Sequence, residues 1–155
     1  GIWPFGQGEV AMPREQSLLF LPQKTYLPLG TLRESLLYPY PADFATDDTI
    51  RHIMELCKLS QLVGKLDERE DWSHMLSLGE QQKIAFVRAI LQKPAWLFLD
   101  EATSAIDEGT EDELYTLLHT HLKDSAIISV GHRSTLLDYH ERKLVIDNMG
   151  QWSLT

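Results

Sequence analysis

The sequence predicts an α/β fold, in which a parallel β-sheet is flanked by helices and carries a helical insertion. Three short apolar runs, residues 17–21, 95–99 and 126–130, lack the alternation of polar and apolar residues seen in half-exposed strands. Such runs are typical of strands buried on both faces, as in a parallel sheet covered by helices. Helical patterns separate the three runs, and polar side chains follow each of them. A chain of 155 residues is long enough for one such domain.

Two capping boxes mark the places where helices begin. Thr31 is followed three residues later by Glu34, and Ser77 is followed three residues later by Glu80. The first helix is expected to end near residue 38, before two prolines, and the second near residue 92. Further helices are predicted over about residues 46–57 and 108–122, and a C-terminal hairpin is predicted to pair residues 143–147 with residues 151–154.

Composition and charge exclude several classes of function. The chain has 23 Asp and Glu against 14 Lys and Arg, which gives a net charge of −9. An acidic surface argues against broad nucleic-acid binding, because that needs a basic face. The apolar runs are too short for a transmembrane helix. The single cysteine, Cys57, excludes an internal disulfide and a cysteine zinc site. We expect Cys57 in the core and all four tryptophans in packed positions: Trp3, Trp72, Trp96 and Trp152.

Polar side chains stand where each predicted strand ends. Gln23 follows the first strand, Asp100 and Glu101 follow the second, and His132 follows the third. Ligands of open α/β sheets bind beyond the carboxyl ends of the strands, so we expect these four residues to converge on one crevice. Two adjacent carboxylates suit Mg²⁺ and a polarised water, because Mg²⁺ takes oxygen ligands. The pattern therefore predicts phosphoryl transfer or hydrolysis.

The helix that begins after Ser77 adds a second feature of this kind. Its first turn offers free backbone N–H groups, the Ser77 hydroxyl and Gly79, where the main chain can be approached closely. The positive end of the helix dipole and its unpaired N–H groups favour a bound anion.

Taken in order, these segments resemble the ATP-binding domain of ABC transporters. Residues 76–82, Leu-Ser-Leu-Gly-Glu-Gln-Gln, resemble the LSGGQ signature, although Leu78 replaces its first glycine and Glu80 its glutamine. Residues 96–101, Trp-Leu-Phe-Leu-Asp-Glu, resemble Walker B followed by the catalytic glutamate. Residues 104–107 match the D-loop, Leu21-Pro22-Gln23 match the Q-loop, and His132 matches the switch histidine. Five motifs in order over nearly the whole chain are a specific signal, whereas any one alone is weak.

The resemblance implies a P-loop NTPase fold of the RecA-like type. Its core would comprise about residues 1–25 and 94–155, while about residues 26–93 would form the Q-loop, an inserted helical subdomain and the signature helix. Residues 28–34 resemble half-transporters with a fused membrane domain. Within that group the likeness is greatest to bacterial uptake systems for peptide antibiotics, bleomycin and vitamin B12, and to peroxisomal fatty-acyl transporters.

The resemblance also implies a role for each residue at the strand ends. Asp100 would hold Mg²⁺, mostly through water, and Glu101 would polarise the attacking water. His132 would contact the γ-phosphate of ATP. Gln23 would sense both Mg²⁺ and the water, and would connect the site to the membrane domain.

Other residues would act across a dimer of two such ATPase domains arranged head to tail. Ser77 and Gly79, with Glu80 beside them, would bind the ATP held by the partner subunit, and Asp107 would act at the same interface. Asp107 also suits a plain helix cap. The resemblance further implies a transmembrane domain as partner and a place at the cytoplasmic face of a membrane, with a bacterial inner membrane favoured by the subfamily.

The phosphate-binding loop of the family is the motif that these residues lack. No Gly-x-x-x-x-Gly-Lys-Ser/Thr occurs, and Leu66 follows the only Gly-Lys pair. We therefore interpret the chain as truncated at its N-terminus and inactive by itself. Loss of a strand and helix predicts exposed sheet edges and an uncovered apolar face, which a second copy could cover.

Two other hypotheses belong to different functional classes. ATPases of DNA repair and chromosome structure share the signature, but they separate their motifs by long coiled coils, and the 54 positions from Gln23 to Ser77 contain no heptads. A non-catalytic interaction module derived from an ABC ATPase would explain a missing phosphate loop. The presence of both Glu101 and His132 argues against such a module, because it needs neither residue.

Overall fold

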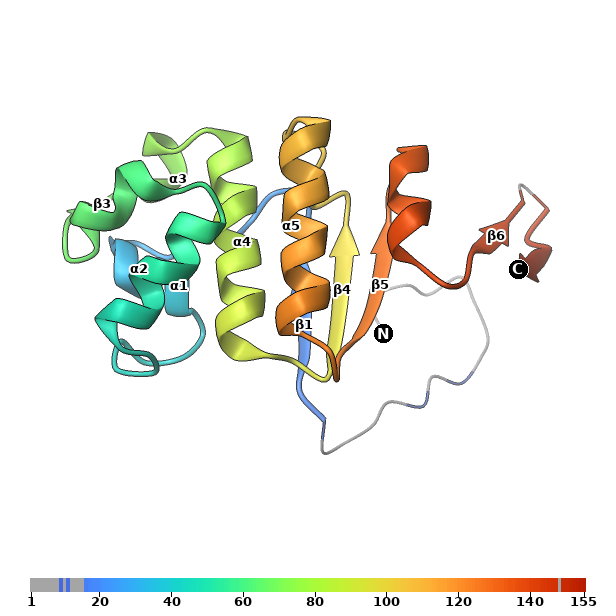
Figure 1. Cartoon of the computed structure of the whole chain (residues 1–155), viewed down its shortest axis with the longest axis horizontal. Coiled ribbons are helices and arrows are strands. Elements are labelled where there is room, and N and C mark those ends of the chain that lie inside the picture. Colours follow the sequence, from blue (N-terminus) through green and yellow to red (C-terminus); the bar gives the residue numbers. More distant parts are fainter. Residues whose placement is uncertain (1–8, 10, 12–15, 148) are drawn as a thin grey trace.

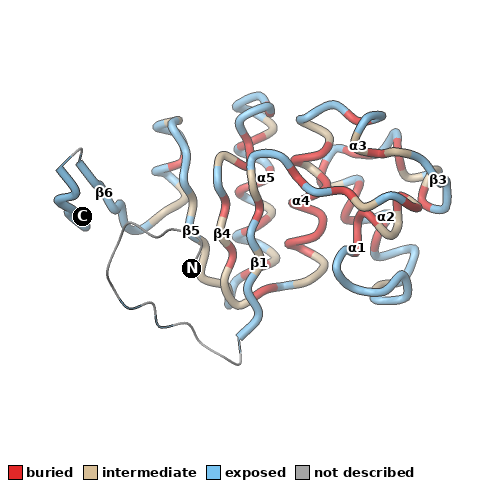
Figure 2. Tube along the Cα trace, turned by 180° about the vertical axis from the view of Figure 1, so that it is seen from behind, coloured by how far each residue is buried: buried red, intermediate tan, exposed pale blue. Residues whose placement is uncertain are grey.

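A three-stranded parallel sheet with helices on one face forms the core of the molecule (Figure 1). The computed structural model describes residues 9, 11, 16–147 and 149–155. The strands are β1 (Leu18–Leu21), β4 (Trp96–Asp100) and β5 (Ala126–Val130), in the spatial order β1-β4-β5. Helices α4 (Leu78–Gln92) and α5 (Glu108–His121) cover one face of this sheet (Figures 1 and 2). The predicted parallel sheet is therefore confirmed.

The two faces of the sheet differ in their environment. Leu21, Leu97 and Leu99 point toward the helices and are almost completely buried. On the opposite face lie four apolar side chains that are 40–59% exposed, which we term the open sheet face: Leu18, Phe20, Ile128 and Val130. Figure 2 shows the strands from this side. The expectation that helices cover both faces is wrong for the described residues, and the expected uncovered apolar face is confirmed.

A helical region follows β1 in the chain and lies beside the sheet (Figure 1). It contains α1 (Leu32–Leu37), α2 (Asp47–Leu56), the 3₁₀ helix η1 (Ser60–Lys65) and the short α3 (Trp72–Met75). A two-stranded antiparallel ribbon pairs β2 (Gly30–Thr31) with β3 (Arg69–Glu70). The sequence did not predict η1, α3 or this ribbon, because each is too short to show a repeating pattern of hydrophobic residues.

The capping boxes form as predicted and fix the helix starts. Thr31 caps α1, and its backbone N–H donates to Glu34 Oε2 over 2.7 Å. Thr46 caps α2 in the simpler way, by accepting from the N–H of Thr49. Helix α4 ends at its C-cap, Lys93, whose backbone is left-handed (φ 45°).

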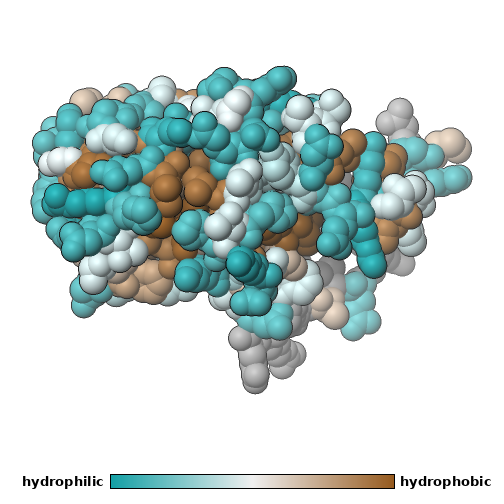
Figure 3. Space-filling view, viewed as in Figure 1, coloured by the Kyte–Doolittle hydropathy of each residue, from teal (hydrophilic) through white to brown (hydrophobic). Residues whose placement is uncertain are grey.

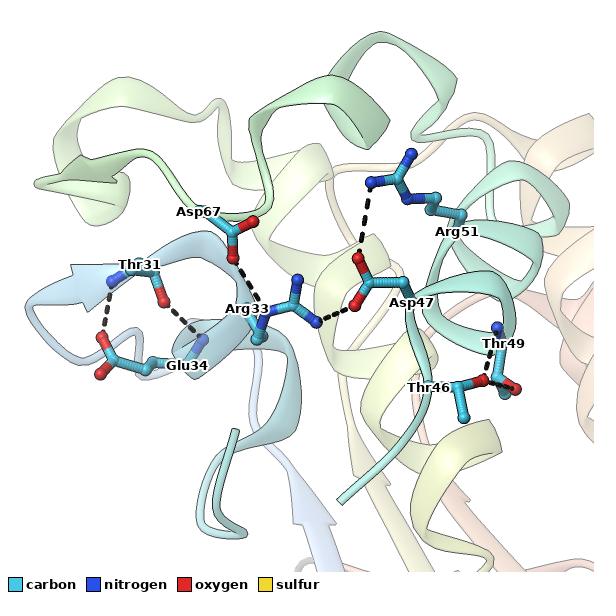
Figure 4. A network of polar contacts seen from close by, with 8 residues as sticks. All are labelled: Thr31, Arg33, Glu34, Thr46, Asp47, Thr49, Arg51 and Asp67. Atoms are coloured by element: carbon cyan, nitrogen blue, oxygen red, sulfur yellow. Dashed lines mark hydrogen bonds and ion pairs between the residues drawn. The ribbon is translucent and has the colours of Figure 1, made fainter. Parts of the chain in front are cut away.

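A network of ion pairs ties the helical region together (Figure 4). Arg33, whose side chain is 13% exposed, lies with Nη1 2.6 Å from Asp47 Oδ1 and Nε 3.0 Å from Asp67 Oδ1. The other oxygen of Asp47 lies 3.6 Å from Arg51. The Arg33 guanidinium lowers the pKa of Asp47, and the two carboxylates raise the pKa of Arg33. These contacts fix α1 against α2 and against the segment that follows η1.

A single apolar core runs from the sheet into the helical region. Cys57 and Trp72 lie in this core, as expected, and burial raises the pKa of the Cys57 thiol to about 12. Trp96 is partly buried, whereas Trp152 is 71% exposed, so the packing role expected for Trp152 is wrong. Trp3 lies outside the described residues.

The chain ends in a 3₁₀ helix, η2 (Ser134–Tyr139), and a hairpin of β6 (Leu144–Ile146) and β7 (Trp152–Leu154). The predicted hairpin is thus confirmed. Figure 3 shows that hydrophilic side chains cover much of the helical face, with smaller apolar areas between them. Among the described residues, no helix combines the length and apolar character that crossing a bilayer requires.

Candidate active site

Three strand ends bring Gln23, Glu101 and His132 together. Gln23 Nε2 donates to Glu101 Oε2 over 2.9 Å, and His132 Nε2 lies 2.9 Å from Glu101 Oε1. The Glu101 side chain is 30% exposed and that of His132 is 87% exposed, so solvent reaches part of the carboxylate. Asp100 is exposed at the end of β4, opposite Val130 in the sheet. The predicted convergence is therefore seen for Gln23 and His132, each of which contacts Glu101.

The main chain of Glu101 has a left-handed conformation (φ 49°). A non-glycine residue in this region costs on the order of 1–3 kcal/mol, so the surroundings must hold it there. Its N–H donates to the Val130 carbonyl over 2.9 Å, and its carbonyl accepts from the N–H of Ser104 over 3.1 Å. These bonds turn the chain sharply after β4, which directs the carboxylate toward Gln23 and His132.

A buried carboxylate, Glu111, supports the loop that carries the histidine. Glu111 is only 2% exposed and accepts hydrogen bonds from the hydroxyls of Thr103 and Thr135. Its Oε2 lies 3.3 Å from Nη1 of Arg133, the residue after His132. Glu111 therefore links the segment that follows Glu101 to the segment that follows His132. Sequence reasoning missed this residue, since an acidic residue in the first turn of a helix normally indicates only a favourable dipole interaction.

The first turn of α4 is closed by its own capping box. The Ser77 hydroxyl donates to Glu80 Oε2 over 2.7 Å and accepts from the Glu80 N–H over 3.3 Å. Gln61 Nε2 donates to the other oxygen of Glu80 over 3.0 Å. Partial burial acts to raise the pKa of Glu80, but the hydrogen bonds from Ser77 and Gln61 outweigh it and hold that pKa below its usual value. Glu80 is therefore ionised at neutral pH and serves as the partner of Ser77.

Asp107 caps α5, and the expected capping role is confirmed. Its Oδ1 accepts from the N–H of Thr110 over 3.0 Å, and this bond lowers the pKa of Asp107. Asp107 is exposed, and its cap uses Oδ1, which leaves Oδ2 available for other contacts.

Oxygen ligands at the strand ends suit a hard cation. The exposed Asp100 carboxylate and the amide oxygen of Gln23, whose nitrogen faces Glu101, provide such ligands. No cluster of three or more His, Cys, Asp or Glu suited to a metal occurs within residues 16–147 and the other described positions. Mg²⁺ in nucleotide sites needs no such cluster, because phosphate oxygens and water complete its shell. These residues therefore fit a magnesium ion.

Comparisons with known proteins find members of the ABC transporter family. A sequence profile described as ABC transporter matches residues 7–104. An uncharacterised ABC transporter ATP-binding protein of Haemophilus influenzae is 45% identical over 154 residues, which are 99% of this chain and 26% of that protein. The lysosomal cobalamin transporter ABCD4 of Homo sapiens is 39% identical over 167 residues, which cover 99% of this chain and 27% of that protein.

The fold has a similar counterpart among solved structures. A bacterial Atm1-family ABC exporter with ATP bound superposes with a TM-score of 0.73 at 24% identity, over 84% of this chain and 23% of that one. This similarity shows a shared fold. The chain spans about a quarter of the length of the relatives that it matches.

Proposed function

Because this chain belongs to the ABC transporter family, we propose that it forms part of the ATP-binding and hydrolysis domain that powers a membrane transporter. The observation that carries the proposal is the contact of Glu101 with both His132 and Gln23, each over 2.9 Å, at the carboxyl edge of a parallel sheet. That edge is the position at which open α/β sheets bind their ligands.

Within this proposal the side chains divide the work of hydrolysis. Glu101 orients and polarises the attacking water as a general base, held by His132 on one oxygen and Gln23 on the other. The exposed His132 ring would contact the γ-phosphate of a bound ATP. Asp100, and the amide oxygen of Gln23, would hold Mg²⁺, which when bound neutralises charge on the phosphate oxygens.

The signature segment would serve the nucleotide of a second copy in a head-to-tail dimer. Ser77 and Gly79 stand at the positive end of α4, where an anion is favoured. The Ser77 hydroxyl donates to Glu80, so binding a phosphate requires that hydroxyl to rotate away from the carboxylate. Glu80 then acts through the capping box that orders Ser77, while Asp107 uses its free oxygen at the same interface.

The remaining parts of the proposal concern partners, location and activity. A transmembrane domain would receive the work of hydrolysis, at the cytoplasmic face of a membrane, the bacterial inner membrane in our proposal. The residues of this chain would neither bind ATP tightly nor hydrolyse it alone, because they contain no phosphate-binding loop with its lysine.

A calorimetric titration with Mg-ATP tests the proposal. The 155-residue chain and a longer form that includes a phosphate-binding loop are titrated side by side, and ATP turnover is then measured for the longer form. We expect binding and turnover only in the longer form. Glu101→Gln should retain binding and lower kcat by a factor of about 10²–10⁴. The matched control is His52→Ala, which removes an exposed histidine on α2. Tight binding by the short chain, or unchanged kcat in Glu101→Gln, would refute the proposal.

A further inference from the structure

Gln82 is a fully buried polar side chain at the point where three segments of the chain meet. Its Nε2 donates to the main-chain oxygen of Gln23 over 2.9 Å and to Ser104 Oγ over 3.0 Å. The same nitrogen lies 3.4 Å from the main-chain oxygen of Glu101. Its Oε1 accepts from the N–H of Ala105 over 3.0 Å. One amide thus reaches the end of β1, the turn after β4 and the 104–107 loop.

Gly79 stands one turn before Gln82 and packs against the same loop. Residues three apart share a face of a helix, so both lie toward the 104–107 loop. A Cβ at Gly79 would lie 2.9 Å from the main-chain oxygen of Ala105, which shows how closely the two backbones approach. Ala105 therefore donates its amide to Gln82, while its carbonyl lies close to the backbone of Gly79. The first turns of α4 and this loop are held as one unit.

The contacts of Gln82 extend from that unit to the catalytic groups. Gln23 Nε2 donates to Glu101 Oε2 and lies 3.4 Å from Ser104 Oγ, so the side chains of Gln23 and Gln82 meet at the same serine hydroxyl. A buried amide that lost these partners would leave several polar groups without hydrogen bonds, which is unfavourable in a buried position. Displacement of α4 relative to β1 and β4 is therefore resisted at this one side chain.

We propose that Gln82 is a positioning residue that couples the signature segment to the catalytic group. When residues 77–79 engage the nucleotide of the partner subunit, α4 and the 104–107 loop move together, and Gln82 carries that movement to the main chain of Gln23 and Glu101. Gln82 touches no reacting atom itself. This inference rests on the proposed function and names how the same site is regulated.

Hydrogen exchange in the chain itself tests the mechanical part. The probe is the amide of Ala105, observed by NMR in the wild type, Gln82→Met and Gln82→Glu. Methionine keeps the shape and removes every bond, and glutamate restores an acceptor for Ala105. The matched control is Gln81→Met, because the neighbouring Gln81 is also buried but donates instead to the carbonyls of Ser73 and Leu76.

We expect the Ala105 amide to exchange at least about tenfold faster in Gln82→Met, less than about twofold faster in Gln81→Met, and within about threefold of wild type in Gln82→Glu. Unchanged exchange in Gln82→Met would overturn the proposal. Equal acceleration in Gln81→Met would also overturn it, because the effect would then be general loosening of α4.

Kinetics in a longer form that hydrolyses ATP test the functional part. Gln82→Met should lower kcat about tenfold with KM for ATP changed less than twofold, since Gln82 does not touch the nucleotide. A loss carried by KM alone, or an equal loss in Gln81→Met, would overturn the proposal. Absence of turnover in the wild type would refute the proposed function alone, and the exchange measurements would still decide whether Gln82 joins the segments.

Discussion

Replacing Glu111 by alanine should destabilise the chain by about 3 kcal/mol. Removing one member of a fully buried ion pair costs about 3–5 kcal/mol. Arg133, the partner of Glu111, is 32% exposed and keeps part of its hydration, which places the effect at the lower end of that range. The same change leaves the hydroxyl of Thr103, which is only 4% exposed, without its hydrogen-bond acceptor Glu111. Glu111→Gln retains an acceptor for that hydroxyl and should cost about half as much.

Urea unfolding followed by far-UV circular dichroism measures this effect. A loss of 3 kcal/mol corresponds to about a 140-fold change in the folding equilibrium, at about 1.4 kcal/mol per factor of ten. With a slope of about 2 kcal/mol per molar urea, the midpoint falls by about 1.5 M. The control is Glu108→Ala, because Glu108 is exposed in the same first turn of α5 and loses only a dipole interaction of about 0.3–1 kcal/mol. The free energies of unfolding of Glu111→Ala and Glu108→Ala are then compared. A difference of less than about 0.5 kcal/mol, roughly the scale of the dipole interaction, would show that Glu111 is not an important buried ion-pair partner.

Three further predictions follow from individual contacts. Gly79→Ala should lower the free energy of unfolding by about 1–3 kcal/mol despite alanine's better helix propensity, since its Cβ meets a loop carbonyl at 2.9 Å. Gly64→Ala, whose Cβ meets nothing within 4 Å, is the control in the same urea assay, and an equal loss there would contradict the steric argument. Burial and the nearby His119 lower the pKa of His140, so the unfolded chain binds its proton first. The free energy of unfolding should therefore decrease as the pH falls below about 6.5. Measured as a function of pH, the Tm of the wild type should show this decrease and the Tm of His140→Phe should lack it. The Cys57 thiol is fully buried and has a pKa of about 12, so it should not react with iodoacetamide at pH 8 until the chain is unfolded. Mass spectrometry measures the labelling, and fast labelling of the native chain would contradict the burial of Cys57.

Local patterns in the sequence were sufficient to predict the main elements. The three apolar runs became β1, β4 and β5, and the boxes at Thr31 and Ser77 became the starts of α1 and α4. The contact of Gln23 with Glu101 followed from one general rule, because parallel strands end at the same edge of their sheet.

Features that depend on tertiary contacts were not predictable from the sequence. Gln82 and Glu111 look like ordinary helix residues, and only the packing of distant segments around them shows what they hold. Trp152 was expected to pack, yet its two strands pair with each other and, among the described residues, with no other strand, which leaves the indole exposed. The uncovered sheet face was predictable only from the resemblance to the ABC ATPase domain with its phosphate-binding loop, because the apolar runs by themselves indicate strands covered on both sides.

The pairing of the three strands has a geometric consequence for the site. Gln23, Glu101 and His132 each follow a strand of the same ladder, so their separations are set by its register. A strand that keeps its inward face can change register only by two residues at a time, which is a step of about 7 Å. The length of such a step is more than twice the 2.9 Å distances that separate Glu101 from Gln23 and from His132. The ladder therefore allows no gradual spreading of the three side chains by sliding: the cluster is either assembled or lost outright.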